Sequence, residues 1–420
     1  MSIEQTLAYI HSVKWQGAKP GLSRTRELLS KLGDPQNRLR FVHIAGTNGK
    51  GSTAAMTAAV LKASGYKTGL YTSPYILRFN ERMQIDGEQI SDSVLGELTD
   101  VIRPFADAME DSPTEFELIT ALAMLWFERN GCEIVVLEVG MGGELDSTNV
   151  IATPEVAVIT AIGLDHTAEL GGTIAEIASA KAGIIKPGGT VVCYGEEESA
   201  VRVFAEKCRA VGAELIRTDF SRLSVAGSGL DGSVIDFAPY RGLTIPLAGT
   251  YQPKNAALAI TVIEALRRRG FSIPDDALRS GLASVQWAGR FEVLRRDPVV
   301  ILDGAHNSHG IHAAAQSFTA LFPGQKLIFL VGVMADKDVA SMMAELAPLA
   351  AHFVAVTPHN PRAMKADRLA ELLRTLGAPA VAADTVEDGA KLALRLSGGA
   401  PVAALGSLYF SADVRAAFGG

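Results

Sequence analysis

The stretch of residues 41–64 constrains the fold more than any other part of the sequence. It opens with Phe41–Ala45, a run rich in apolar and β-prone residues, as a buried strand requires. Three glycines interleaved with polar residues follow, and an alanine-rich segment suited to a helix comes next. In this order, backbone N–H groups and the helix dipole favour bound negative charge. The stretch therefore predicts an α/β fold with an anion site at the end of its first strand.

Two residues at the predicted helix start, Lys50 and Ser52, identify the anion as phosphate. Without them, the glycines would indicate a simple connection between a strand and a helix. The lysine neutralises phosphate charge, and the hydroxyl matches the serine or threonine of phosphate-binding loops. The spacing is unusual, because fewer residues than in the common pattern separate the first two glycines and a glycine comes between lysine and serine. We therefore predict a variant phosphate-binding loop formed by Gly46, Thr47, Asn48, Gly49, Lys50, Gly51 and Ser52.

Length and composition limit the class of protein. A chain of 420 residues is long for one domain, so two domains are expected. The net charge of −7 argues against a general nucleic-acid surface, which requires a basic excess. The three cysteines show no metal-binding spacing, which indicates reduced thiols in a cytoplasmic protein. The sequence shows no signal-peptide pattern and no apolar run of membrane-spanning length, so we expect no membrane partner. It also shows no exposed apolar seam that would indicate an oligomer, so we expect a monomer.

Polar residues follow other predicted strands as well. Glu138 ends a strand rich in Val, Ile and Leu, where an acid either faces a site or is exposed at the strand end. Ser73 follows a short strand at 67–71, and His166 follows a strand at 156–160. Open α/β sheets bind ligands at the carboxyl ends of their strands, and an acid beside a phosphate loop suits Mg²⁺. For His166, a metal or phosphate role and a structural role both remain open.

The remaining pattern alternates helices and strands. Helices are predicted over residues 2–12, 22–32, 92–108, 114–129 and 173–182, and in a long segment that follows Asn255 and ends at Arg269. Thr114 and Glu117 form a plausible capping pair. Lys181 lies in the helix at 173–182, and its spacing alone indicates a solvated lysine. Residues 190–247 alternate strand and helix, with β-like sections at 233–237 and 243–247.

A second parallel α/β sheet is predicted toward the carboxyl terminus. Its strand candidates are 299–302, 326–333, 353–357 and 402–405. We therefore expect one domain over residues 1–296 and a smaller one over residues 297–420.

The order of the motifs resembles one family along nearly the whole chain. That family is the folylpolyglutamate synthase/dihydrofolate synthase family, a branch of the Mur ligase superfamily. Its motifs are matched here by the phosphate loop, 72–74, 78–83, 138–143, 145–149, 162–166, 181–184, 289–291, 303–307 and 336–338. Any one motif is weak, but this many in the same order form a specific signal.

The resemblance implies a fold and an activity. The fold is an amino-terminal P-loop-containing, Mur-ligase-like ATPase domain followed by a smaller Rossmann-like α/β domain. The first, over residues 1–296, would bind ATP and folate, and the second, over residues 297–420, would be the glutamate ligase domain. The activity is that of an ATP-dependent carboxylate–amine ligase. In this family Mg·ATP phosphorylates the carboxylate of a folate, or of 7,8-dihydropteroate, and the amino group of L-glutamate attacks the resulting acyl phosphate. Two Mg²⁺ sites and a monovalent cation are the implied cofactors besides ATP.

The resemblance also implies roles for individual residues. The catalytic set is Lys50, His166, Lys181 and Arg290. Besides the phosphate loop, the ATP contacts are Asn255, Arg290 and Asp303, where the last binds ribose or braces the domain interface. The metal ligands are Ser73, Glu138, His166 and Lys181, the lysine after carbamylation to N6-carboxylysine. The substrate contacts are Leu145, Asp146, Ser147, His306 and Asn307, with capping of a strand-end turn as the alternative for the last two.

Three positions depart from the family pattern. Glu144 stands where a basic residue is usual, which bears on substrate preference, and Ser308 replaces a proline. Lys19 stands in a loop that commonly carries an acid in members that accept dihydropteroate. Folylpolyglutamate synthesis is therefore the primary expectation, and dihydrofolate synthesis the secondary one.

Two other classes of protein share part of this pattern. A Mur ligase that acts on a cell-wall nucleotide would need a separate UDP-binding domain, but only about forty residues precede Phe41. A nucleotide-dependent switch protein would account for Lys50, Ser52 and Glu138. It would not account for a second α/β domain that carries the motif 303–307.

Overall fold

The computed structural model describes residues 1–13 and 21–419. Lys19 and most of its loop lie outside the described residues. The chain forms two compact units that interleave in sequence, Met1–Ser221 with Asn255–Ser284, and Arg222–Lys254 with Val285–Gly420. The assignment of binding roles to residues 1–296 and 297–420 stays a prediction. The chain passes from one compact unit to the other after Ser221, Lys254 and Ser284. No helix among the described residues is long and apolar enough to span a bilayer.

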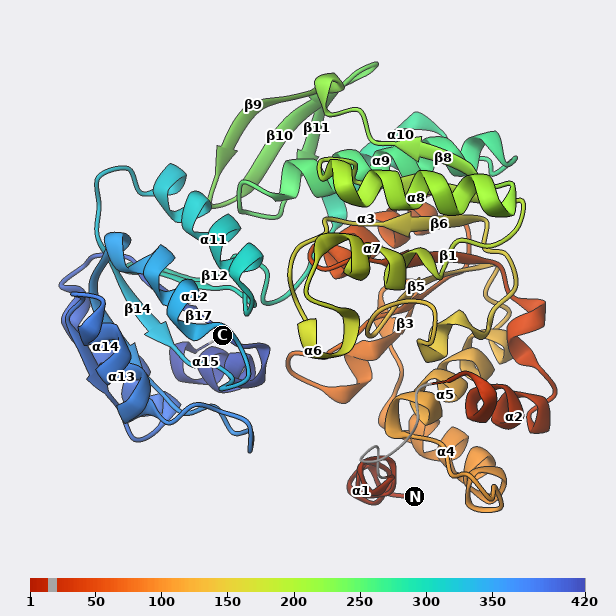
Figure 1. Cartoon of the computed structure of the whole chain (residues 1–420), viewed down its shortest axis with the longest axis horizontal. Coiled ribbons are helices and arrows are strands. Elements are labelled where there is room, and N and C mark those ends of the chain that lie inside the picture. Colours follow the sequence, from red (N-terminus) through yellow and green to blue (C-terminus); the bar gives the residue numbers. More distant parts are fainter. Residues whose placement is uncertain (14–20, 420) are drawn as a thin grey trace. The chain divides into compact units, whose positions relative to one another are not determined.

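The first unit is built on an eight-stranded sheet in the order β4-β3-β2-β5-β1-β6-β7-β8 (Figure 1). The strands from β2 to β8 are parallel, and the short hairpin β3–β4 is antiparallel at one edge. Its strands are β1 (Phe41–Ala45), β2 (Thr68–Tyr71), β3 (Met83–Ile85), β4 (Glu88–Gln89), β5 (Ile134–Glu138), β6 (Val156–Ile159), β7 (Thr190–Cys193) and β8 (Glu214–Arg217). Its helices are α1 (Ile3–Ser12), α2 (Ser23–Lys31), α3 (Lys50–Ala63), α4 (Asp92–Asp107), α5 (Glu115–Arg129), α6 (Thr167–Leu170), α7 (Ile174–Ala182), α8 (Glu198–Val211), α9 (Gln252–Arg268) and α10 (Asp275–Ser284).

Helices cover this sheet on both faces. Phe41 and Ala45 point to the same face of β1, because strand residues alternate. They pack into apolar clusters formed with α1, α2, α4 and α5 and with α7 and α8. On the other face, α3 packs against β2 and β5, and α10 packs against α3. Gly281 permits this last contact, because a Cβ built on it would lie 2.5 Å from Val60 Cα.

The second unit contains two sheets. The larger has the order β12-β13-β17-β14-β15-β16, and the smaller is antiparallel with the order β11-β10-β9. The strands are β9 (Leu223–Gly229), β10 (Gly232–Phe237), β11 (Tyr240–Ile245), β12 (Glu292–Arg296), β13 (Val299–Leu302), β14 (Leu327–Val331), β15 (Ala350–Ala355), β16 (Ala380–Ala382) and β17 (Val402–Leu405). The helices are α11 (Ser308–Leu321), α12 (Val339–Leu346), α13 (Ala366–Thr375), α14 (Val386–Ser397) and α15 (Ser411–Phe418).

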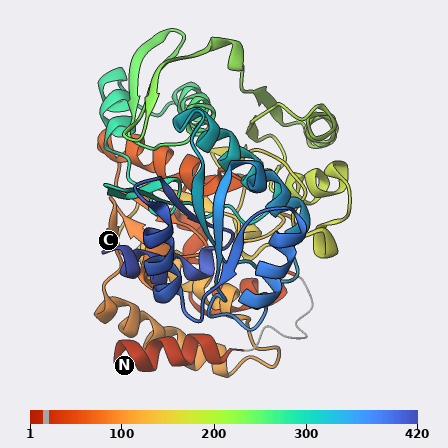
Figure 2. The ribbon, with the colours of Figure 1, turned by 90° about the vertical axis from the view of Figure 1, so that its left-hand side faces the viewer.

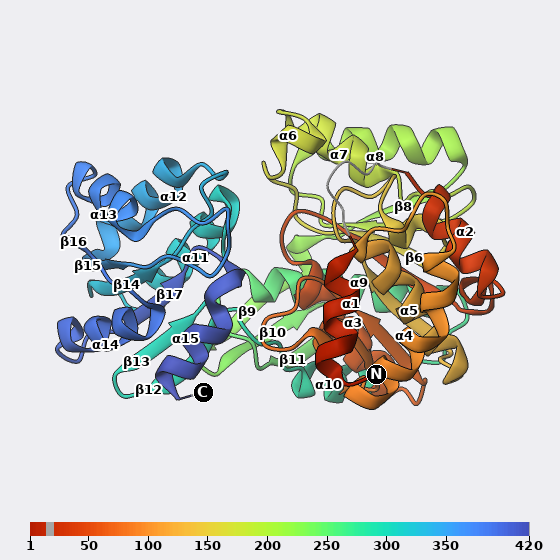
Figure 3. The same ribbon diagram turned by 90° about the horizontal axis from the view of Figure 1, so that it is seen from below.

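The larger sheet of the second unit is also covered on both faces. Alternate residues of β14 pack against α11, α12 and α13 on one face and against α14 and α15 on the other. Figures 2 and 3 show the helices on both sides of this sheet. The predicted α/β architecture is confirmed in both units.

The sequence interpretation missed several strands. β12 was not predicted, and it lies antiparallel to β13, because the two residues between them permit only a tight turn. β9 was not predicted, because its exposed sequence lacks an apolar alternation. β3, β4 and β16 are too short to give a periodic pattern. The predicted capping pair of Thr114 and Glu117 is confirmed at the start of α5.

Candidate active site

The predicted phosphate loop joins β1 to α3. Gly46 has φ 153°, and a Cβ built on it would lie 1.8 Å from Thr160 Oγ1, so no side chain fits there. Gly49 has φ 85°, and a Cβ on it would lie 2.6 Å from Asn255 Oδ1. Asn255, predicted from the resemblance, thus lies against this loop. α3 begins at Lys50, so the loop leads directly into a helix amino terminus, where backbone N–H groups and the helix dipole favour an anion.

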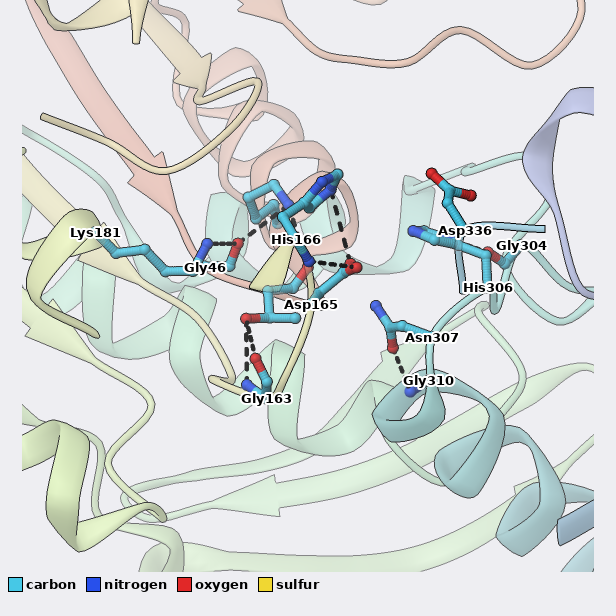
Figure 4. A network of polar contacts seen from close by, with 12 residues as sticks. Gly46, Gly163, Asp165, His166, Lys181, Gly304, His306, Asn307, Gly310 and Asp336 are labelled. Atoms are coloured by element: carbon cyan, nitrogen blue, oxygen red, sulfur yellow. Dashed lines mark hydrogen bonds and ion pairs between the residues drawn. The ribbon is translucent and has the colours of Figure 1, made fainter. Parts of the chain in front are cut away.

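Two lysines converge on the carbonyl oxygen of Gly46. Lys50 Nζ donates to Gly46 O and to Thr47 O, both at 3.2 Å. Lys181 Nζ, from α7, donates to Gly46 O at 2.8 Å (Figure 4). Lys181 is only 4% exposed. Its spacing in the sequence indicated a solvated side chain, but the fold buries it. Burial, with the nearby charge of Lys50, lowers the pKa of Lys181 to about 7, so a substantial fraction of its amine is neutral near pH 7.

Ser73 and Glu138 meet at the carboxyl ends of the adjacent strands β2 and β5. Glu138 is 4% exposed, and the backbone N–H of Ser73 donates to its Oε2 at 3.3 Å. Carboxylate and hydroxyl oxygens are ligands of the kind that Mg²⁺ prefers. Mg²⁺ is commonly held by one or two carboxylates together with phosphate oxygens. The Ser73–Glu138 pair therefore fits one Mg²⁺ beside the phosphate loop.

His166 follows β6 on the other side of β1. It adopts a left-handed conformation with φ 50°, and its N–H donates to Asp165 Oδ1 at 2.9 Å. Its Nε2 lies 3.9 Å from Asp165 Oδ2, and the side chain is 43% exposed (Figure 4). In the part of the chain that the structure describes, no three side chains of His, Cys, Asp or Glu gather as a metal site. The predicted metal ligands include only two such side chains, Glu138 and His166, so metal binding would also need Ser73, a carbamylated Lys181 and phosphate oxygens.

The predicted substrate residues Leu145, Asp146 and Ser147 lie on the loop after β5. Leu145 is 54% exposed, whereas Asp146 and Ser147 are buried. The Asp146 carboxylate accepts hydrogen bonds from Met141 N at 2.9 Å and from Thr148 N at 3.0 Å. Burial raises the pKa of Asp146, and these donors oppose that effect. Asp146 thus holds the loop that carries the exposed Leu145.

Three further exposed apolar side chains accompany Leu145 and were not predicted. Met141 lies on the same loop, Leu164 follows β6, and Leu77 follows β2. Met141 and Leu164 share a sequence signal, because each is a large apolar residue directly after a glycine, whereas Leu77 lies in an apolar segment and has no such signal. Their exposure after neighbouring strands gives this sheet edge an apolar component next to its charged groups.

In the second unit, Asp303 organises the loop after β13. Its Oδ2 accepts hydrogen bonds from Tyr251 Oη at 2.7 Å and from Phe291 N at 2.8 Å, and its Oδ1 accepts one from Ala305 N at 2.8 Å. Arg290 lies beside this loop, since a Cβ built on Gly304 would stand 2.2 Å from its Nη1. The sequence interpretation missed Tyr251, because a tyrosine distant in the chain gives no local sign of such a contact.

His306 and Asn307 follow on the same loop. His306 Nδ1 donates to Gly304 O at 2.8 Å, since a carbonyl oxygen can only accept (Figure 4). Asn307 caps α11, because its Oδ1 accepts a hydrogen bond from Gly310 N at 2.7 Å. Asn307 therefore has the capping role that was the alternative to a substrate contact.

Comparisons with known proteins place this arrangement in a family. The Mur ligase middle domain matches residues 44–263, and the glutamate ligase domain of Mur ligases matches residues 289–408. The folylpolyglutamate synthase of Lacticaseibacillus casei is 37% identical and is covered over 98% of its length by 99% of this chain. The dihydrofolate synthase/folylpolyglutamate synthase of Bacillus subtilis is 38% identical, with 82% of each chain covered.

A solved structure gives the same result at the level of the fold. Folylpolyglutamate synthase from Mycobacterium tuberculosis, complexed with ADP and AMPPCP, superposes with a TM-score of 0.92 at 32% identity. The match covers 100% of this chain and 98% of that one. With its variant phosphate loop, its buried Lys181 and its paired Ser73 and Glu138, the chain belongs to the folylpolyglutamate synthase/dihydrofolate synthase family of Mur ligases.

Proposed function

We propose that the protein joins L-glutamate to a folate in an ATP-dependent ligation. The observation that carries the proposal is the convergence of Lys50 and Lys181 on Gly46, next to the buried Ser73–Glu138 pair. Phosphoryl transfer to a carboxylate needs positive charge around the phosphates. Lys50 of the phosphate loop, the buried amine of Lys181 and the Glu138 carboxylate, as a ligand for Mg²⁺, suit that need. The names of the curated relatives supply the substrate class.

The reaction follows from what each group does to the charge. Lys50 and the N–H groups at the start of α3 bind the β- and γ-phosphates, which lowers the cost of moving the γ-phosphoryl group. An oxygen of the folate carboxylate attacks that group, so ADP leaves and an acyl phosphate forms. The amino nitrogen of L-glutamate then attacks the acyl carbon, phosphate leaves and the nitrogen loses a proton. Ser73, Glu138 and His166 would hold Mg²⁺, which supplies charge neutralisation when bound.

Lys181 supports a further part of the proposal. A neutral lysine amine adds to CO₂ and loses a proton, which gives a carbamate with an anionic oxygen pair. Its burial and its proximity to Lys50 favour the neutral amine that this addition requires. As N6-carboxylysine, Lys181 would hold a second Mg²⁺ near the phosphates. The monovalent cation implied by the family resemblance stays part of the proposal.

The apolar residues at the same edge fit the aromatic body of a folate. We place it against Leu145, with Asp146 and Ser147 shaping the loop that presents that side chain. Glu144, next to Leu145, bears on the choice between a folate and 7,8-dihydropteroate. Folate is the primary substrate of the proposal and dihydropteroate the second.

The remaining contacts belong to the proposal as well. Asn255 and Arg290 would contact ATP, and Asp303 would brace the loops around it, as its three hydrogen bonds favour. His306 and Asn307 would line the L-glutamate side. In this proposal the protein is a monomer in the cytoplasm. Residues 1–296 bind ATP and folate, and residues 297–420 form the glutamate ligase domain.

ADP release by the purified protein with Mg·ATP tests the proposal. A reduced folate monoglutamate and 7,8-dihydropteroate are supplied separately, each with and without L-glutamate. ADP release that requires both the folate and L-glutamate supports the ligase, and release with dihydropteroate in addition supports the second activity. ADP release without either substrate would favour a nucleotide switch, and turnover only with a cell-wall nucleotide would favour another Mur ligase.

A further inference from the structure

We propose that Asn149 is a positioning residue that locks the loop 143–149 to the end of α7, so that Leu145 and Lys181 are placed as one body. The proposal rests on the proposed function for its catalytic consequence. The claim that Asn149 joins the two segments rests only on its hydrogen bonds to Glu144 and Gly183 and on the backbone contacts around them.

The side chain of Asn149 joins two segments that are distant in sequence. It is 3% exposed, and its Nδ2 donates to Glu144 O at 3.0 Å and to Gly183 O at 3.1 Å. Because both partners are carbonyl oxygens, the NH₂ group must face them, and both of its hydrogens are used. One carbonyl belongs to the loop after β5 and the other to the C-cap of α7.

Two glycines bring the same segments into direct backbone contact. A Cβ built on Gly143 would lie 2.9 Å from the carbonyl oxygens of Ala180 and Lys181. A Cβ built on Gly183 would lie 2.3 Å from Glu144 Cα. The N–H of Glu144 also donates to Ala180 O at 3.0 Å. The loop therefore has no room to move without either breaking these hydrogen bonds or displacing the last turn of α7.

That last turn carries Lys181, whose Nζ donates to Gly46 O in the phosphate loop. The path from the exposed Leu145 to the phosphate loop thus runs through Asn149, the turn at Gly183 and Lys181. In a ligation, the folate carboxylate that accepts the phosphoryl group must be aligned with that group, and a misplacement of about 1 Å costs on the order of 10²-fold in rate. Asn149 touches neither group, so it acts by holding the elements that do.

The test compares Asn149→Ala with a matched control, Asn130→Ala. Asn130 also donates a side-chain hydrogen bond to a backbone carbonyl, to Trp126 O at 2.8 Å, at the end of α5. We expect Asn149→Ala to lower kcat by about 10- to 100-fold, with the Kd for AMPPCP within about threefold of wild type. Asn130→Ala should leave kcat within about twofold of wild type.

Hydrogen exchange measured by mass spectrometry tests the lock itself. In Asn149→Ala, peptides covering residues 141–148 and 178–185 should both exchange faster, whereas Asn130→Ala should change neither. A kcat within twofold of wild type, or faster exchange confined to 141–148, would overturn the proposal. If Asn149→Ala does not fold, Asn149→Ser, which keeps one short donor, replaces it with the same outcomes. The exchange result needs no turnover, so it remains decisive even if the ligase assignment fails.

Discussion

Gly304→Ala is expected to disable the enzyme by moving Arg290. The φ of Gly304 is ordinary, so alanine changes the space and not the backbone preference. A Cβ there would lie 2.2 Å from Arg290 Nη1 and 2.3 Å from Leu408 Cδ2. Non-bonded atoms in contact stand about 3.5 Å apart, so the guanidinium must retreat by roughly 1.3 Å.

A displacement of this size has two calculable consequences. If Arg290 stabilises the transferring phosphate charge, a misplacement of about 1 Å costs on the order of 10²-fold in kcat/KM, or about 2.7 kcal/mol. The displaced Leu408 adds an overpacking cost of about 1–3 kcal/mol in stability. Turnover should therefore fall far more than the melting temperature would explain.

The assay is glutamate-dependent ADP release in a double-mutant cycle. If Gly304 acts through Arg290, then Gly304→Ala should have little further effect in an Arg290→Ala background. Gly227→Ala is the control, because a Cβ there meets nothing within 4 Å. Effects that multiply in the double variant, or near-normal turnover in Gly304→Ala, would refute the reasoning.

Three further predictions concern the first unit. Lys50→Ala should abolish turnover, a loss of several kcal/mol of transition-state stabilisation, while leaving the melting temperature unchanged; normal activity would remove the phosphate-loop assignment. Burial lowers the pKa of His43 to about 3, so below pH 6.5 the unfolded chain binds a proton that the folded chain does not. Stability should accordingly fall by about 1.4 kcal/mol between pH 7.5 and 5.5 on account of His43, and urea denaturation should show a shallower pH dependence in His43→Gln. An equal slope in the variant would show that His43 is not the cause. Glu155 accepts hydrogen bonds from Arg40 at 2.9 Å and Arg269 at 2.8 Å, so Glu155→Gln should lower stability by about 1 kcal/mol. An unchanged denaturation midpoint would count against this bridge.

The parts of the site that depend on local sequence were predictable. The phosphate loop follows from a strand, glycines and Lys50 within one short stretch. A site role for Glu138 follows from an acid at the end of an apolar strand near that loop. The pairing of Ser73 with Glu138 was implied only by the family resemblance, because the adjacency of β2 and β5 cannot be derived from the order of elements.

The parts that depend on contacts distant in sequence were not predictable. The spacing of Lys181 indicated a solvated side chain, and its burial against Gly46 appears only when α7 packs beside the phosphate loop. No role was predicted for Tyr251, or for Asn149 within its motif, because Asp303 and Gly183, with which they form hydrogen bonds, lie far away in the sequence. Asp303 was predicted as a site residue, yet the three donors that converge on its carboxylate could not be read from the motif.

The transfer of oxygen from the folate carboxylate to phosphate tests the central claim most directly. A reduced folate monoglutamate labelled with ¹⁸O at both oxygens of its reacting carboxylate would be turned over with Mg·ATP and L-glutamate, and the released phosphate analysed by mass spectrometry. An acyl phosphate requires one labelled oxygen in each phosphate released. Unlabelled phosphate accompanied by full amide formation would contradict the account.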